Sequence, residues 1–397
     1  MLLHIARGWC ASATIALIVT CYLVARIYYT PPILAGASVI SSGIAVLTGG
    51  TGGFGLEIST GLALAGLDVV LACRTGHETR CRDVTRAQWA ASGVAAERSL
   101  FIESVDLASC ASTEDFVQRV SRQYAGRLRV LVNAAGIGAA ASNSGSSRHA
   151  VGPVLTADGF EQTFHVNVLS YYILCAGLMA ALRASGQPSA VVNVASENAV
   201  SSGFDIEDLQ FLRRPLAPYD GRPYQQSKMA ERLLTWQLHD LYGPAATPPG
   251  QPAIYWNAVH PGVNGTRLYG PPGSISHQRI AQFCSIRGVC NDLKTGAQRP
   301  VWLATKAPAS RVSGTMWSMM PYPGGPLGEL LWPLFFPRLA GELPSAPSQS
   351  RRVARRLDDA SLRGRLWTSL QQDAKACSLT SADAGLASAG REDRSRS

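Results

Sequence analysis

Two side chains in the second half of the chain have the types and the spacing for proton transfer. Tyr224 and Lys228 lie four residues apart in a segment expected to be helical, which places them on one face of the helix. A phenol with a pKa of about 10 is a weak base at neutral pH, but a neighbouring ammonium favours its ionised form. Tyr224 could therefore act as general acid or general base. An exposed helical pair without a chemical role is the alternative.

Ser196 and Asn167 are two further polar candidates for the same site. Ser196 follows the β-branched run at residues 190–194, so it could hydrogen-bond a substrate oxygen at the end of a strand. Asn167 stands among apolar residues in the expected helix 160–182, where an interior amide needs a polar partner. An asparagine that only bonds nearby backbone is the alternative.

A glycine-rich turn in the first half has the composition of a phosphate-binding loop. The apolar run 44–47 leads into the turn 48–55, and a helix is expected over residues 56–65. Glycines permit a tight turn and a close approach of backbone N–H groups to phosphate, which a helix N-terminus also attracts. A merely flexible loop is the alternative, and the position between a strand and a helix disfavours it.

The next expected strand, residues 68–73, ends at Arg74 with no carboxylate beside it. In a dinucleotide-binding fold an acidic residue here binds the ribose hydroxyls of NAD, whereas a cation can pair with the 2′-phosphate of NADP. Arg74 therefore favours NADPH over NADH. A solvated surface arginine is the alternative.

Two later strands end in residues that complete a dinucleotide pattern. Residues 100–105 run into Asp106-Leu107, with a carboxylate near an adenine edge, and residues 128–132 run into Asn133-Ala134-Ala135-Gly136. With the glycine turn, their order and spacing resemble the short-chain dehydrogenase/reductase superfamily over residues 43–318. This resemblance implies an α/β fold, a Rossmann-type doubly wound parallel sheet of about seven strands with helices on both faces.

The resemblance also implies roles for single residues. Ser196 and Tyr224 would bind the substrate oxygen. Lys228 would hold the nicotinamide ribose and lower the tyrosine pKa, and Asn167 would hold a water of the proton relay. The implied cofactor-binding positions are Thr48, Gly49, Gly53, Phe54, Gly55, Arg74, Asp106, Leu107, Asn133, Ala134, Gly136, Tyr224, Lys228, Pro261, Gly262, Val263 and Thr266.

The region around the expected site departs from the common pattern in places. Ala195 stands where the family often has a second serine, and the interval from Ser196 to Tyr224 is long. The long interval is similar to the retinol dehydrogenase-like branch. Residues 226–238 and 257–269 resemble most its X-linked, polyprenol dehydrogenase-like member, from which the loop 137–155 departs.

Both ends of the chain are expected to lie outside the catalytic domain. Residues 1–30 predict a membrane anchor, because residues 9–24 are mostly apolar and stand between Arg7 and Arg26. A cleaved signal peptide is the alternative, and residues 31–42 are expected to form a linker. The apolar segment 319–345 is expected to contact the membrane or to form a buried edge. Residues 346–397 are expected to be a basic, partly disordered tail, in which Leu362, Leu366, Trp367 and Leu370 could form an amphipathic helix.

The composition indicates how large a core the chain can form, which partners are expected and in which state the cysteines are. The 397 residues, 46% hydrophobic and 16% charged, can form a sizeable core. Arginines near the C-terminus supply much of the net charge of +9, so nucleic acid is not an expected partner. The nine cysteines are scattered without a Cys-x-x-Cys pair, so they are predicted to be mostly reduced packing residues, with no metal site.

These features together predict an NADP(H)-dependent oxidoreductase that interconverts an alcohol and an aldehyde or ketone. The anchor favours a lipophilic substrate of the polyprenol or dolichol type, a retinoid or a steroid, and a protein held in the endoplasmic reticulum membrane. A catalytically silent NADP-binding scaffold at a membrane is the alternative. The sequence leaves open whether the chain forms a homodimer and which face of the membrane carries the domain.

Overall fold

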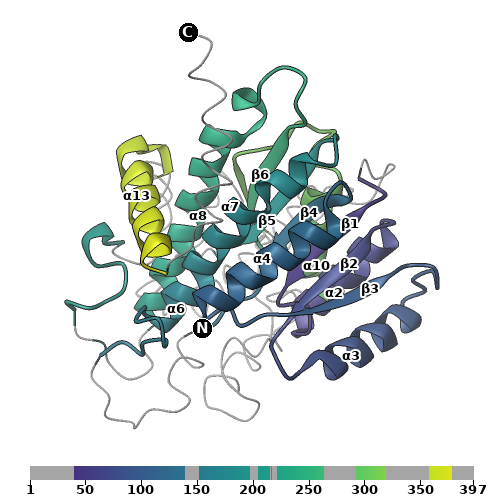
Figure 1. Cartoon of the computed structure of the whole chain (residues 1–397), viewed down its shortest axis with the longest axis horizontal. Coiled ribbons are helices and arrows are strands. Elements are labelled where there is room, and N and C mark those ends of the chain that lie inside the picture. The colour runs from purple at the N-terminus through teal and green to yellow at the C-terminus, as the bar shows by residue number, and fades with distance from the viewer. Residues whose placement is uncertain are drawn as a thin grey trace, which may run out of the picture.

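A parallel sheet of seven strands forms the centre of the domain (Figure 1). The computed structural model describes residues 40–138, 152–196, 204–214, 216, 221–262, 292–318 and 357–377. The strands are β1 (Ile44–Thr48), β2 (Asp68–Cys73), β3 (Leu100–Ser104), β4 (Leu128–Asn133), β5 (Ser189–Val194), β6 (Ile254–His260) and β7 (Thr315–Ser318). Their order in the sheet is β3-β2-β1-β4-β5-β6-β7. The order reverses between β1 and β4, and ligands of such sheets bind at the carboxyl ends beside this point.

Helices cover both faces of the sheet and create two cores. One core lies under α4 (Cys110–Tyr124), α7 (Ser170–Arg183) and α8 (Arg222–Tyr242). The other lies under α2 (Gly53–Leu64), α3 (Glu78–Ala91) and α10 (Leu293–Thr305). Strand β1 contributes side chains to both cores, because successive side chains of a strand point to opposite faces of the sheet. Ile44 and Val46 enter the first core, and Ala45 and Leu47 enter the second. The predicted α/β class and doubly wound sheet are confirmed.

One continuous helical stretch in the first core is apolar and long enough to cross a membrane. It comprises α6 (Gln162–Phe164), the π-helix η1 (His165–Leu169) and α7. Most of it is buried inside the domain, so its hydrophobicity is that of a core helix. The predicted anchor at residues 1–30 and the apolar segment 319–345 lie outside the described residues.

A helix from the predicted tail packs onto this core. Helix α13 (Ala360–Ala376) is capped at its N-terminus by Asp359, whose side chain accepts a hydrogen bond from the Leu362 N–H group. Leu366 and Leu370 are buried, and the Trp367 ring lies 5.2 Å from that of Tyr172 on α7. The amphipathic helix is thus confirmed, and part of the region expected to be a loose tail belongs to the packed domain.

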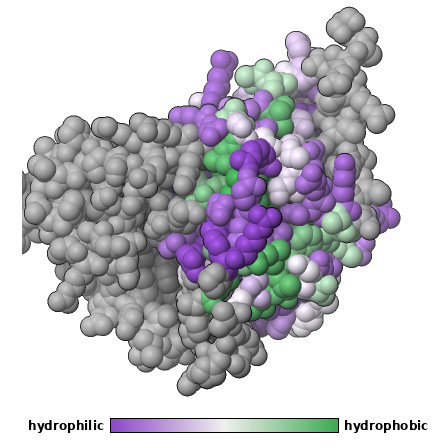
Figure 2. Space-filling view, turned by 90° about the vertical axis from the view of Figure 1, so that its left-hand side faces the viewer, coloured by the Kyte–Doolittle hydropathy of each residue, from purple (hydrophilic) through white to green (hydrophobic). Residues whose placement is uncertain are grey.

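The outer surface beside α13 is mostly polar, as expected when the apolar face of the helix is buried. Figure 2 views the molecule from the side where α13 lies in Figure 1, and its described residues are mostly hydrophilic, with smaller hydrophobic areas between them. Arg363 on α13 forms an ion pair of 2.6 Å with Asp240 on α8. Arg365 forms a second one with Glu207, which lies in the single helical turn η3 (Ile206–Asp208).

Four cysteines are paired, which corrects the prediction that the cysteines are mostly reduced packing residues. Cys73 is bonded to Cys81, and Cys110 is bonded to Cys377 across a sequence separation of 267 residues. Cys175 is buried and free, as predicted. Separation of this size leaves no local spacing pattern, so the sequence alone could not reveal the second pair.

Candidate active site

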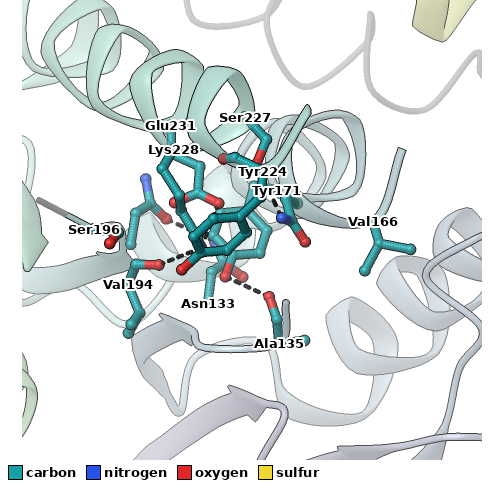
Figure 3. A network of polar contacts seen from close by, with 12 residues as sticks. Asn133, Ala135, Val166, Tyr171, Val194, Ser196, Tyr224, Ser227, Lys228 and Glu231 are labelled. Carbon is teal, nitrogen blue, oxygen red and sulfur yellow. Dashed lines mark hydrogen bonds and ion pairs between the residues drawn. The ribbon is translucent and has the colours of Figure 1, made fainter. Parts of the chain in front are cut away.

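Helix α8 brings the proposed proton donor and the lysine together. The helix begins at Arg222 with Pro223 in its first turn, so Tyr224 lies at its start and Lys228 one turn further. The Lys228 ammonium lies 5.5 Å from the centre of the Tyr224 ring (Figure 3). The predicted common helix face is confirmed.

Lys228 is buried, and two oxygens stabilise its charge. Its ammonium donates hydrogen bonds to the Val194 carbonyl oxygen at 2.9 Å and to Glu231 Oε1 at 2.8 Å. Glu231 is also buried, and burial raises the pKa of its carboxyl group to about 7 against the opposing charges of Lys228 and Arg232. Glu231 was not predicted as a site residue, although its position three residues after Lys228 in an apolar helix face was a usable signal.

The Tyr224 hydroxyl is a hydrogen-bond partner of Ser196, which lies at the end of β5. Burial raises the pKa of Tyr224 above its ordinary value, and the negative charge of Glu231 raises it further, while the bond to Ser196 lowers it. This direction is opposite to the lowering expected from Lys228. Burial of the phenol is the largest cause, and Lys228 itself forms an ion pair with Glu231. The raised pKa therefore keeps the Tyr224 phenol protonated at neutral pH.

Asn167 lies in the π-helix η1 and connects three parts of the site. Its amide nitrogen donates to Ser227 Oγ and to the Ile137 carbonyl oxygen, both at 3.0 Å, and its amide oxygen accepts from the Ile137 N–H group at 2.9 Å. Backbone bonding, the alternative for Asn167, is thus present. A π-helix within an α-helix is frequent at functional sites, where it directs a side chain out of the regular spacing.

Gly136 lies where β4, η1 and α8 converge. A Cβ atom at this position would lie 3.4 Å from Asn167 Oδ1 and 3.5 Å from Lys228 Nζ. Tyr171, on the core side, donates a hydrogen bond of 2.7 Å to the Ala135 carbonyl oxygen (Figure 3). The structure therefore brings the four predicted catalytic residues together at the carboxyl end of β4 and β5, and adds Glu231 and Tyr171.

The glycine turn lies beside this site, between β1 and α2. Gly49 has a φ of +70°, and a Cβ atom there would lie 2.7 Å from the Ala135 backbone. Gly55 lies against the Gly49 carbonyl oxygen and leaves no room for a Cβ atom. Among the described residues no side chain caps the start of α2, so its first N–H groups can receive an anion. These features fit the phosphates of a dinucleotide.

Two of the predicted cofactor positions have structural roles as well. The Thr48 hydroxyl accepts hydrogen bonds from the N–H groups of Ala134 and Ala135, at 3.0 and 3.1 Å. Asn133 is fully buried and donates to Asn193 on β5 at 2.9 Å, so its side chain joins two strands.

The remaining predicted positions follow strand ends. Arg74 is exposed after β2, Asp106 and Leu107 follow β3, and Gly262 has a φ of +85° after β6. All of these strands are parallel, so the positions share the carboxyl edge of the sheet. Val263 and Thr266 lie outside the described residues.

Known proteins resemble this chain in sequence and in fold. The family model described as short chain dehydrogenase matches residues 43–206. Retinol dehydrogenase 13 of Mus musculus is 29% identical over 321 residues, covering 79% of this chain and 80% of that protein. Polyprenol dehydrogenase of Danio rerio is 31% identical over 255 residues, covering 60% and 68%.

A solved structure shares the fold. L-Sorbose reductase from Gluconobacter frateurii, complexed with NADPH and L-sorbose, superposes with a TM-score of 0.52 at 21% identity, covering 72% of this chain and 97% of that one. At this identity the likeness concerns the fold alone.

The tight glycine turn makes a testable prediction. Gly55→Ala should destabilise the protein by about 1–3 kcal/mol, because the added Cβ atom collides with the Gly49 carbonyl oxygen and the backbone must move. Gly52→Ala is the matched control, since its Cβ atom would have 3.8 Å to the nearest atom. The measurement is urea unfolding of both variants. Equal stability of the two variants would contradict the close approach at Gly55.

Proposed function

This chain belongs to the short-chain dehydrogenase/reductase family, in its retinol dehydrogenase-like branch, and from this premise we propose that it is an NADP(H)-dependent oxidoreductase acting on lipophilic alcohols and their aldehydes or ketones. The family membership makes it an oxidoreductase of alcohols. The observation that carries the proposal is the hydrogen-bonded pair Tyr224 and Ser196, with the Lys228 ammonium one helical turn away.

The residues present fit a nicotinamide dinucleotide. The uncapped start of α2 suits its phosphates, and so do Gly49 and Gly55, where a Cβ atom would collide with the backbone. Arg74 supplies an exposed cation at the end of β2. The bound nicotinamide would supply or accept the hydride.

In this mechanism the Ser196 and Tyr224 hydroxyls bind the carbonyl oxygen of the substrate. Tyr224, protonated because burial and Glu231 raise its pKa, donates its proton to the oxygen as the alcohol forms. In the opposite direction the Tyr224 phenolate accepts the proton of the alcohol. Lys228 would hold the nicotinamide ribose. Asn167 would hold a water that connects Tyr224 to solvent.

The substrate and the location are inferred from the branch. Retinol and polyprenol dehydrogenases are named for apolar alcohols, which supports a retinoid or a polyprenol or dolichol-type substrate, with a steroid as a third candidate. The apolar residues 1–30 support anchoring in the endoplasmic reticulum membrane, where such substrates are dissolved.

Removal of the Tyr224 hydroxyl tests the function directly. Tyr224→Phe should lower kcat for retinal, polyprenal or steroid reduction by about 10²–10⁴-fold, because the proton donor is lost, while NADPH still binds. Steady-state kinetics and NADPH fluorescence titration measure the two effects. A wild-type protein that binds NADPH but converts none of these substrates would support the silent scaffold instead.

Substitution of Arg74 tests the proposed preference for NADPH over NADH. Arg74→Glu should lower the ratio of kcat/KM for NADPH to that for NADH by about 10–100-fold, because a charge-assisted bond to the 2′-phosphate is replaced by repulsion. Arg122→Glu, an exposed change of the same charge on α4, is the control and should leave the ratio unchanged. An unchanged ratio in Arg74→Glu would place the 2′-phosphate elsewhere.

Substitution of Glu231 tests whether its negative charge raises the pKa of Tyr224. Alcohol oxidation requires the Tyr224 phenolate, so its rate should rise with pH through the pKa of Tyr224. Glu231→Gln removes the negative charge that raises this pKa, so the rise should move to lower pH by roughly one unit. Glu97→Gln, an exposed control, should leave the profile in place. A shift to higher pH in Glu231→Gln would contradict the assigned role.

A further inference from the structure

A second cluster of polar side chains lies away from the Tyr224 site, on the face covered by α4 and α13. Cys110, Asp158 and His165 each offer one ligand atom, and these atoms lie within 4.8 Å of one another. Cys377, at the end of α13, brings a second sulfur into the cluster through its bond to Cys110. Three potential ligand atoms from separate parts of the chain therefore lie together, and a further sulfur is bonded to one of them.

The individual contacts define a compact arrangement. His165 Nε2 lies 3.5 Å from Cys110 Sγ and 4.0 Å from Asp158 Oδ2. The Cys110 N–H group donates a 2.7 Å hydrogen bond to Asp158 Oδ2, which fixes the carboxylate at the start of α4. Cys110 is the first residue of that helix, and a helix N-terminus favours a negatively charged sulfur.

His165 is oriented as in known metal sites. The side chain is fully buried, and its other ring nitrogen, Nδ1, lies 3.0 Å from Thr156 Oγ1. When Nδ1–H donates to this hydroxyl, Nε2 presents its lone pair to Cys110 and Asp158. Metal-binding histidines are usually held by such a bond from the second nitrogen.

The ligand types select the metal. Two sulfurs, one imidazole nitrogen and one carboxylate oxygen form a four-ligand set that suits tetrahedral Zn²⁺, whereas Mg²⁺ and Ca²⁺ prefer oxygen alone. We propose that the reduced chain binds one Zn²⁺ through Cys110, Cys377, His165 and Asp158. The ion then fastens α13 to α4 and to η1, the helix that carries Asn167.

The disulfide and the zinc site are two states of the same groups. Reduction of the Cys110–Cys377 bond takes two electrons and two protons from two molecules of a thiol such as glutathione, which become one disulfide. The two cysteine thiols then release their protons as the sulfurs bind Zn²⁺. Both states connect the same helices. No metal site was expected from the sequence, because its cysteines show no local spacing pattern.

The test measures zinc in the full-length protein and does not depend on catalytic activity. Protein treated with excess thiol, supplied with Zn²⁺ and desalted should contain close to one zinc per chain by mass spectrometry. The disulfide form should contain almost none. Replacement of Zn²⁺ by Co²⁺ in the reduced protein should give thiolate-to-cobalt charge-transfer absorption.

Variants identify the ligands. Cys377→Ser and His165→Gln should each lower zinc content and affinity at least tenfold. Cys81→Ser, which breaks the other cysteine pair, should keep full zinc. The proposal is overturned if the reduced, folded protein takes up no zinc, or if Cys110 and Cys377 stay bonded in excess thiol. Full zinc in Cys377→Ser, a change at the end of α13 that the fold should tolerate, also overturns it.

Discussion

The active site depends on a buried ammonium, that of Lys228. Removing a charge from water costs several kcal/mol unless good partners compensate, and here the Val194 carbonyl oxygen and the Glu231 carboxylate do so. These two bonds fix the lysine between α8 and the end of β5. The position of Tyr224 one turn before it, and of Ser196 just after β5, follows from this attachment.

A chain of polar contacts extends from this ion pair into the sheet. The Glu231 carbonyl oxygen accepts from the Thr235 hydroxyl, which in turn accepts from Asn193 on β5, and Asn193 accepts from Asn133 on β4. Every link is buried, so each bond is strengthened by its surroundings and an unpaired member would be costly. The network holds the carboxyl ends of two central strands in register with α8, where the proposed mechanism places the substrate oxygen.

The local parts of this structure could be predicted from the sequence. The glycine turn between a strand and a helix, the strand-end residues and the Tyr224 and Lys228 spacing each depend on a few adjacent residues, and the structure places them at one edge of the sheet. Resemblance to a family supplied the sheet topology and the pairing of Ser196 with Tyr224. Periodicity was enough for α13 as a helix, because its apolar residues recur on one face.

Contacts between distant residues could not be predicted in the same way. The bond between Cys110 and Cys377, and the approach of His165 to Cys110, depend on how α13 and η1 pack, which no local pattern encodes. The bond of the Asn133 side chain to Asn193 was not predicted, because the sequence does not show that this side chain points into the core. The pKa of Tyr224 was expected to fall, and it rises because the phenol is buried and lies near the negative charge of Glu231.

The central claim is that Tyr224 and its neighbours protonate a carbonyl oxygen while a hydride arrives from a nicotinamide cofactor. The most direct measurement incubates full-length protein with NADPH deuterated at the reactive position of the nicotinamide and with retinal, polyprenal or a steroid ketone. Mass spectrometry of the product then locates the label. The expected product is an alcohol with one deuterium on its carbinol carbon, formed far more slowly by Tyr224→Phe. Alcohol without deuterium, or bound NADPH with no alcohol from any of these substrates, would contradict it.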